Sequence, residues 1–178
     1  MQMYVPVPHA TAVGGLTDRR AVDAIARIGI VDDNLDPSLM EGVVERLAEL
    51  LPDASVTTWY KPSGTAPAPD EMIDEMAGNV DVAIAAIAMC GSCTAGVMLD
   101  ATRLHKRGVP TVAISWEIFE RAARSMAKLQ GVPELPLAII QKLEVGQGPA
   151  EQHAKGRACA EAILETLNAP AEPQLHPA

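Results

Sequence analysis

The chain has 178 residues, of which 48% are hydrophobic and only 3% aromatic, and it carries a net charge of −9. This length suits one domain with an aliphatic core, which favours an α/β architecture over an aromatic-rich β-sandwich. The negative charge, without any cluster of basic and aromatic residues, argues against nucleic-acid binding.

No targeting or membrane segment is predicted. Residues 1–15 contain two prolines and no basic stretch of the kind that opens a secretory signal. The most apolar stretch, 80–99, includes an aspartate, two glycines and two cysteines, so it is too polar to cross a bilayer. Three cysteines in such a chain favour a reducing compartment, and we expect a cytoplasmic protein without a disulfide framework.

Strand-like and helix-like segments alternate along the chain. Short apolar or β-branched runs predict strands at 26–34, 55–60, 80–89, 110–116 and 135–141. Amphipathic segments predict helices at 36–52, 70–79, 94–108, 117–131 and 149–167. Asp36 and Pro37 are expected to open the first helix, as its N-cap and its first helical residue. Cys159, on the last helix, is expected to pack in the core.

This alternation predicts a fold class. Five strand–helix pairs indicate a three-layer, doubly wound α/β fold of the Rossmann or flavodoxin-like kind, with a mostly parallel five-stranded sheet. The 80–89 run is the most hydrophobic strand and is expected at the centre. We expect a single domain over 26–167, an N-terminal arm at 1–25 and a flexible tail at 168–178.

Ligands of such sheets bind beyond the carboxyl ends of the strands. The central strand ends at the sequence CGSC, in which Cys90 and Cys93 are separated by two residues. Two of the three cysteines therefore lie where chemistry is expected. Trp116 ends the following strand, where it can wall the pocket or pack in the core.

A cysteine pair at the start of a helix has a specific chemical use. Unpaired backbone N–H groups and the positive end of the helix dipole stabilise a thiolate there and lower its pKa. Gly91 permits a tight turn, and Ser92 and Thr94 can donate hydrogen bonds to the sulfur or cap the helix. Cys90 would attack an electrophilic or oxidised atom, and Cys93 would release the product by forming a disulfide.

Three other interpretations of the motif stay open. A structural zinc site would need further ligands, and the chain has no second CxxC and no HxxxH pair. The two cysteines can also be inert core residues. Finally, Gly91, Ser92 and Thr94 could hold a phosphate, although the chain lacks the GxxxxGK[ST] and GxGxxG patterns.

The motif also carries a family resemblance. The stretch CGSCTAGVMLDATRLHKRGVPTVAI, at 90–114, resembles the motif region of the UGSC family. That family is named for a selenocysteine-Gly-Ser-Cys sequence in which many members have cysteine at the first position. The Asp-Asn pair at 33–34, the proline-rich loop at 61–69 and the segment 119–137 extend the similarity over most of 26–140.

The resemblance implies roles for individual residues. Because selenium is the stronger nucleophile and replaces sulfur at the position of Cys90, that atom is implied to react, with Cys93 as its partner. Residues at family-like positions are implied to bind or polarise the substrate; they are Asn34, Lys61, Ser92, Thr94 and Asp100. With Gly91 and Trp116 they complete the expected substrate-binding set. Lys61 and Asp100 could instead be solvated surface residues.

We therefore expect a thiol-dependent redox enzyme, a reductase or reductive lyase, that acts on a small electrophilic or oxidised substrate through Cys90 and Cys93. A thiol reductant would supply the electrons, and we expect no tightly bound cofactor and no metal. Two alternatives stay open. One is a non-redox lyase or hydrolase with Cys90 as covalent nucleophile, and the other is a non-catalytic subunit or small-molecule binding module.

The non-catalytic alternative is motivated by two departures from the family pattern. A Gly- and Asp-containing approach to the motif is replaced by AIAM, and no His-Pro element follows the last strand. The expected partner is a small-molecule substrate, with no membrane and no nucleic acid. A homo-oligomer or a heteromer with a related chain also stays open, because Met72, Met76 and Met98 suit an interface or a core equally.

Overall fold

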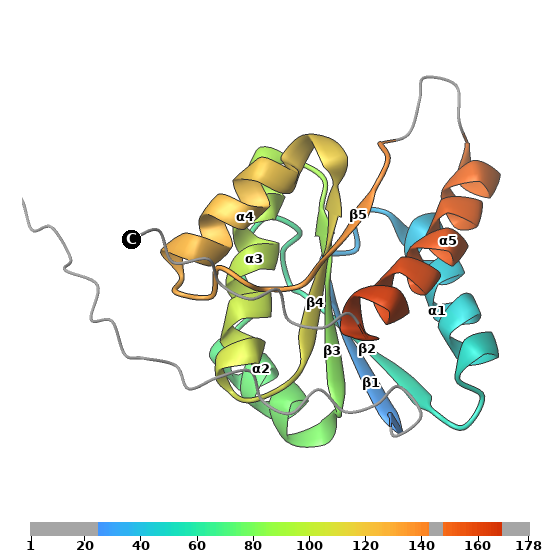
Figure 1. The fold of residues 1–178 in the computed structure, drawn as a ribbon, viewed down its shortest axis with the longest axis horizontal. Coiled ribbons are helices and arrows are strands. Elements are labelled where there is room, and N and C mark those ends of the chain that lie inside the picture. Colours follow the sequence, from blue (N-terminus) through green and yellow to red (C-terminus); the bar gives the residue numbers. More distant parts are fainter. Residues whose placement is uncertain (1–24, 143–147, 169–178) are drawn as a thin grey trace, which may run out of the picture.

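The computed structural model describes residues 25–142 and 148–168. The expected arm up to residue 24 and the expected tail from residue 169 lie outside these described residues. The predicted boundaries of the domain therefore stay predictions. The figures show the described part in colour (Figure 1).

A five-stranded sheet in which every pair of neighbours is parallel forms the centre of the fold (Figure 1). Its strands in chain order are β1 (Arg27–Asp32), β2 (Ser55–Tyr60), β3 (Val82–Ala88), β4 (Thr111–Trp116) and β5 (Leu137–Ile140). In space the order is β2-β1-β3-β4-β5, which is the flavodoxin-like order. The predicted parallel α/β sheet is confirmed, and so is the central place of the 80–89 run.

Helices cover both faces of the sheet, as predicted. They are α1 (Pro37–Leu50), α2 (Asp70–Asn79), α3 (Gly91–Lys106), α4 (Glu120–Leu129) and α5 (Pro149–Asn168), with a short 3-10 helix, η2 (Glu117–Phe119), before α4. Figure 1 shows α1 and α5 on one face and α2, α3 and α4 on the other. Two buried apolar clusters lie between the sheet and these two helical layers.

The helix starts follow from local hydrogen bonding. Asp36 is the N-cap of α1, because its carboxylate accepts from the backbone N–H of Leu39 at 3.1 Å, and Pro37 follows it as predicted. In contrast, α3 begins at Gly91, three residues before the predicted start at Thr94. The cysteine motif is therefore the first turn of a helix rather than a loop in front of one.

Helices α1 and α5 approach each other closely through two glycines. A Cβ atom on Gly42 would collide with the carbonyl oxygen of His153, and one on Gly156 would collide with that of Leu39. Backbone therefore packs against backbone at this crossing. The absence of side chains at these two positions is what allows α5 to cover the sheet beside α1.

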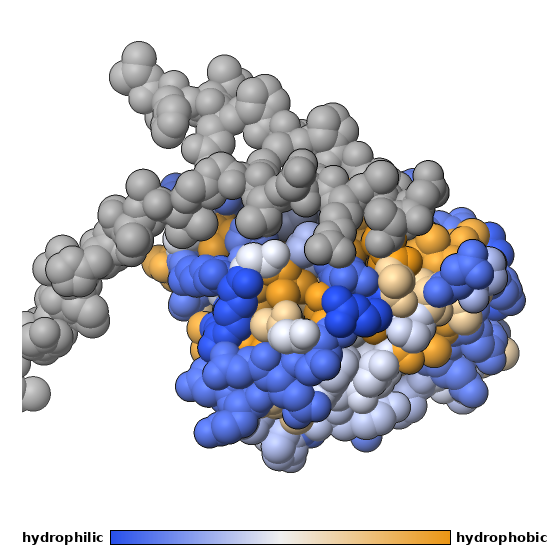
Figure 2. All heavy atoms as spheres, turned by 90° about the horizontal axis from the view of Figure 1, so that it is seen from below, coloured by the Kyte–Doolittle hydropathy of each residue, from blue (hydrophilic) through white to orange (hydrophobic). Residues whose placement is uncertain are grey.

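One face of the described part carries both polar and apolar residues. Seen from below the orientation of Figure 1, hydrophilic residues lie around smaller apolar patches (Figure 2). Within 25–142 and 148–168, no helix has the length and apolar character needed to cross a membrane.

Candidate functional site

The connections of the sheet diverge between β1 and β3. The chain leaves β1 for α1 on one face, whereas it leaves β3 for α3 on the other face (Figure 1). Ligands of doubly wound folds bind at such a switch point, beyond the carboxyl ends of the strands. Just after β1, the backbone N–H of Asp33 donates to the carbonyl of Ala86 in β3 at 3.1 Å.

Cys90 is the N-cap of α3. Its backbone is extended, at φ −146° and ψ 167°, and its Sγ accepts from the backbone N–H of Cys93 at 3.1 Å. The sulfur therefore takes the place that a serine or aspartate oxygen usually has at the start of a helix. At this position the unpaired N–H groups and the helix dipole favour a negative charge on the sulfur.

The two cysteines differ in access. Their Sγ atoms lie at disulfide distance, and their Cα atoms are 5.3 Å apart. Cys93 is fully buried, whereas Cys90 is partly exposed and is followed by exposed Gly91 and Ser92. A molecule arriving from solvent can therefore reach Cys90 but not Cys93. This arrangement suits an attacking sulfur with a shielded partner.

The residues between and after the cysteines have separate roles. The Ser92 hydroxyl lies 3.5 Å from Sγ of Cys90. Thr94 is buried and its hydroxyl donates to the carbonyl of Cys90 at 2.5 Å, so it fixes the helix start. Gly91 is the first residue of α3, and it is not among the described glycines with left-handed backbone, Gly108 and Gly131, so its role in the turn from β3 stays a prediction.

Lys61 and Asp100 form a buried ion pair, with Nζ and Oδ2 at 3.1 Å and each side chain only 1% exposed. The alternative that these residues are solvated is therefore wrong. Asp100 also accepts from the backbone N–H of Ala68 at 2.8 Å and from Arg103 at 3.2 Å. The pair attaches the 61–69 loop to α3, and a contact of either residue with a substrate stays a prediction.

Trp116 packs in the core. Its side chain belongs to the apolar cluster that α1 and α5 cover, and the residue is 9% exposed. Its indole N–H is buried and has no hydrogen-bond partner within the described residues. Of the two interpretations left open for Trp116, the structure supports core packing, and a contact with a ligand stays a prediction.

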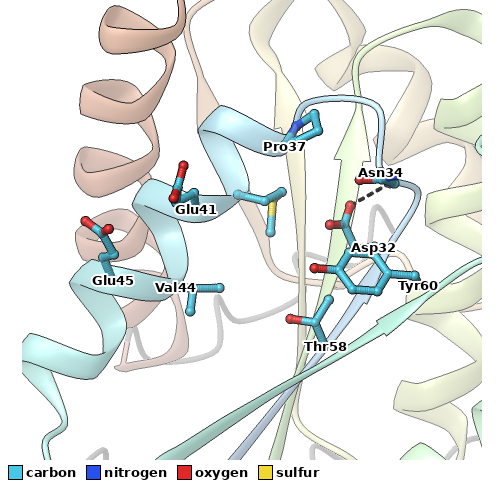
Figure 3. Close-up of a pocket in the computed structure, with 9 residues that line it drawn as sticks. Asp32, Asn34, Pro37, Glu41, Val44, Glu45, Thr58 and Tyr60 are labelled. Atoms are coloured by element: carbon cyan, nitrogen blue, oxygen red, sulfur yellow. Dashed lines mark hydrogen bonds between the residues drawn. The ribbon is translucent and has the colours of Figure 1, made fainter.

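Asn34 lines a cavity of about 540 Å³ between α1 and the ends of β1 and β2 (Figure 3). Its backbone is left-handed, at φ 56°, a conformation that asparagine tolerates better than most residues. No cysteine lines this cavity. The structure thus brings Cys90, Cys93, Ser92 and Thr94 together, whereas Asn34 lines a cavity to which none of them contributes.

Sequence reasoning missed the buried carboxylates beside Asn34. Asp32 and Asp33 are 2% and 3% exposed, and burial raises the pKa of Asp33 to about 6. Backbone N–H groups of Leu35 and Ile87 and the charge of Lys61 oppose this rise, and Asp32 adds to it. The signal available in the sequence was the step from an apolar strand to consecutive aspartates at its carboxyl end.

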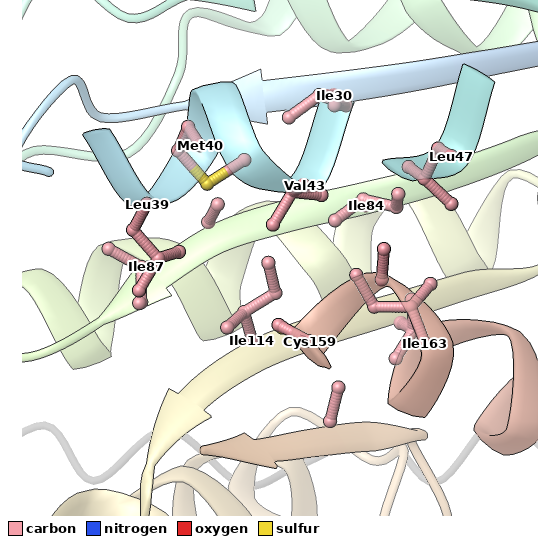
Figure 4. Packing of buried hydrophobic residues seen from close by; sticks show 14 of the residues in the cluster. Ile30, Leu39, Met40, Val43, Leu47, Ile84, Ile87, Ile114, Cys159 and Ile163 are labelled. Carbon is pink, nitrogen blue, oxygen red and sulfur yellow. The ribbon is translucent and has the colours of Figure 1, made fainter. Parts of the chain in front are cut away.

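The third cysteine has no part in this arrangement. Cys159 is 1% exposed among the residues that α5 packs on the sheet, and burial raises the pKa of its thiol to about 12 (Figure 4). Its predicted core position is confirmed. In the described ranges, no group of three or more His, Cys, Asp or Glu side chains is arranged to hold a metal ion.

The sequence pattern of the UGSC family matches residues 2–169, a span that includes the whole sheet and both motif cysteines. The chain belongs to the UGSC family. A comparison of this UGSC chain with curated proteins finds no match.

Among solved structures, the UGSC chain is similar to rubredoxin oxygen:oxidoreductase from the anaerobe Desulfovibrio gigas. The sequence identity is 14% and the TM-score is 0.41. The match covers 80% of this chain and 37% of that protein, so the UGSC chain spans little more than a third of its length.

Proposed function

We propose that this UGSC-family protein is a thiol-dependent redox enzyme that reduces a small electrophilic or oxidised substrate with Cys90 and Cys93. The observation that carries the proposal is the placement of the Cys90 sulfur. The residue is partly exposed, its Sγ accepts from the N–H of Cys93 at 3.1 Å, and the partner sulfur lies at disulfide distance. Membership of a family named for this motif supports it.

The reaction has two covalent steps. The Cys90 thiolate attacks the electrophilic atom of the substrate, so a bond from sulfur to that atom forms and the bond to the leaving group breaks. The leaving group departs with the electron pair. Cys93 then loses its proton and attacks Sγ of Cys90, which forms the disulfide and releases the substrate fragment with two electrons. The Cys93 proton goes to that fragment.

A second turnover needs an external thiol reductant. Two thiols, or one dithiol, convert the disulfide back to the two cysteines and are themselves oxidised to a disulfide. The exchange begins at the partly exposed Cys90, because Cys93 is buried. In the non-redox alternative, a lyase or hydrolase, Cys93 does not react and no reductant is consumed.

The test is to trap the first step with 2-hydroxyethyl disulfide as the probe substrate in the absence of added thiol, and to add dithiothreitol as reductant only when turnover is measured. Intact-mass spectrometry of a Cys93→Ser variant should show a stable mixed disulfide on Cys90. The unsubstituted protein should pass to the internal disulfide and turn over. Cys159→Ser is the matched control and should behave like the unsubstituted protein.

Two results would contradict the redox proposal. One is multiple turnover by Cys93→Ser at an unchanged rate, which would favour the lyase or hydrolase alternative. The other is adduct formation no faster than with a free thiol of similar exposure, which would favour a non-catalytic binding module.

A further inference from the structure

The cavity of about 540 Å³ beside α1 is separate from the cysteine pair and has the size of a small-molecule site, for which ~300–1,000 Å³ is typical. Its lining residues include three carboxylates and no lysine, arginine or histidine. We propose that this cavity binds a small organic cation, an ammonium compound with an apolar part. The proposal does not depend on the redox function.

The buried wall of the cavity carries an incompletely satisfied carboxylate. Asp32 is 2% exposed, and its Oδ1 accepts from the backbone N–H of Asn34 at 2.8 Å. Within the described residues its Oδ2 has no hydrogen-bond partner, and Figure 3 shows the carboxylate at the cavity. This oxygen is not one of the buried side-chain atoms that lack a partner, so it reaches the open cavity, where a ligand N–H can bond to it.

The opposite wall adds negative charge from α1, where Glu41 and Glu45 are one helical turn apart (Figure 3). Glu45 is paired with Arg157 at 3.8 Å, and its carboxylate also lies 3.0 Å from the ring of His153. Glu41 has no ion-pair partner in the described part of the chain. The charge of Lys61 also acts on Asp32, but its ammonium group is bonded to Asp100.

The remaining lining suits the apolar part of such a ligand. The ring of Tyr60, which is 62% exposed, lies beside Asp32 and can face a cation. Met40 and Val44 form the apolar side of the cavity on α1. An anionic ligand would be repelled by the carboxylates, and a neutral apolar ligand would add no donor to the one that Asp32 already has from Asn34.

The test is calorimetric titration of the full chain with three probes of similar shape: benzylammonium, benzyl alcohol and benzoate. Benzylammonium should bind at least tenfold more tightly than either of the others. Asp32→Asn and the exposed Glu41→Gln should each weaken its binding at least threefold. Backbone amide NMR signals of Asn34, Val44 and Thr58 should shift on titration.

Matched controls separate this site from the cysteines. Glu71→Gln removes an exposed carboxylate in the first turn of α2 and should leave benzylammonium affinity unchanged. Cys90→Ser should also leave it unchanged. Should Asp32→Asn fail to fold, Glu41→Gln decides the question. Equal binding of benzyl alcohol or benzoate, an unchanged affinity in the folded charge variants, or loss of binding in Cys90→Ser would each overturn the proposal.

Discussion

The buried carboxylate of Asp100 holds both ends of the 61–69 loop, because it pairs with Lys61 Nζ at 3.1 Å and accepts from the N–H of Ala68 at 2.8 Å. The loop also passes close to α3 at Gly96, where a Cβ atom would approach the backbone of Ala66 to 3.3 Å. One side chain on α3 therefore determines how the loop after β2 lies against the helix that begins with Cys90.

Removing the cation of this pair should destabilise the protein. Lys61→Met removes the buried cation from Asp100 and leaves Arg103 as the charged partner at its other oxygen, and we expect the free energy of unfolding to fall by about 3 kcal/mol. The measurement is urea unfolding followed by circular dichroism. Lys128→Met, at an exposed position of α4, is the control and should change stability by less than about 0.5 kcal/mol. Equal stability of the two variants would contradict a structural role for the pair.

Asp33 should make stability fall as the pH rises. Burial raises its pKa in the folded protein to about 6 from an ordinary value of 3.8, so the folded state retains this proton to higher pH than the unfolded state does. Its stabilising effect is complete below the unfolded pKa and is lost as the pH rises through the folded pKa.

The comparison that isolates Asp33 uses Asp33→Asn, which cannot lose a proton. Between about pH 4 and about pH 7, the unfolding free energy of the unsubstituted protein should fall by about 1–2 kcal/mol relative to that of Asp33→Asn. Denaturant unfolding across this range measures the difference. The unfolding free energy of Asp53→Asn, a substitution in an exposed turn, should change with pH in the same way as that of the unsubstituted protein. If the unfolding free energy of Asp33→Asn also changed with pH as that of the unsubstituted protein does, the raised pKa of Asp33 would be contradicted.

The crossing of α1 and α5 should not tolerate a methyl group. Gly42→Ala places a Cβ against the carbonyl oxygen of His153, and neither helix backbone can give way cheaply. We expect a loss of about 1–3 kcal/mol in unfolding free energy. Gly78→Ala in α2 is the matched control, since nothing lies within 4 Å of its Cβ, and it should be neutral or stabilising by up to about 1 kcal/mol. Similar stability of both variants would contradict the close approach.

Local patterns were sufficient to predict most of the fold. The apolar run 80–89 predicts the central strand, and Asp36 followed by Pro37 predicts the start of α1, because both depend on neighbouring residues alone. The start of α3 was predicted three residues late. The sequence did predict that N–H groups at a helix start would stabilise the Cys90 sulfur, but only the structure shows that Cys90 is the N-cap and that the donor is Cys93.

The candidate site was less predictable, since it depends on residues that are far apart in the chain. Lys61 and Asp100 are 39 residues apart, and only the packing of the loop on α3 shows that they are paired and buried. Likewise, the sequence marks Asn34 as a residue at a strand end but cannot place it beside a cavity formed with α1 and β2.

The central claim is that the start of α3 holds the Cys90 sulfur as a reactive thiolate. The most direct measurement is the rate of iodoacetamide alkylation against pH in a Cys93→Ser, Cys159→Ser variant, where Cys90 is the remaining cysteine. We expect the alkylation rate to reach half its maximum at least about one pH unit below the ~8.5 of a free cysteine. A midpoint at or above that of a free cysteine would contradict the central claim.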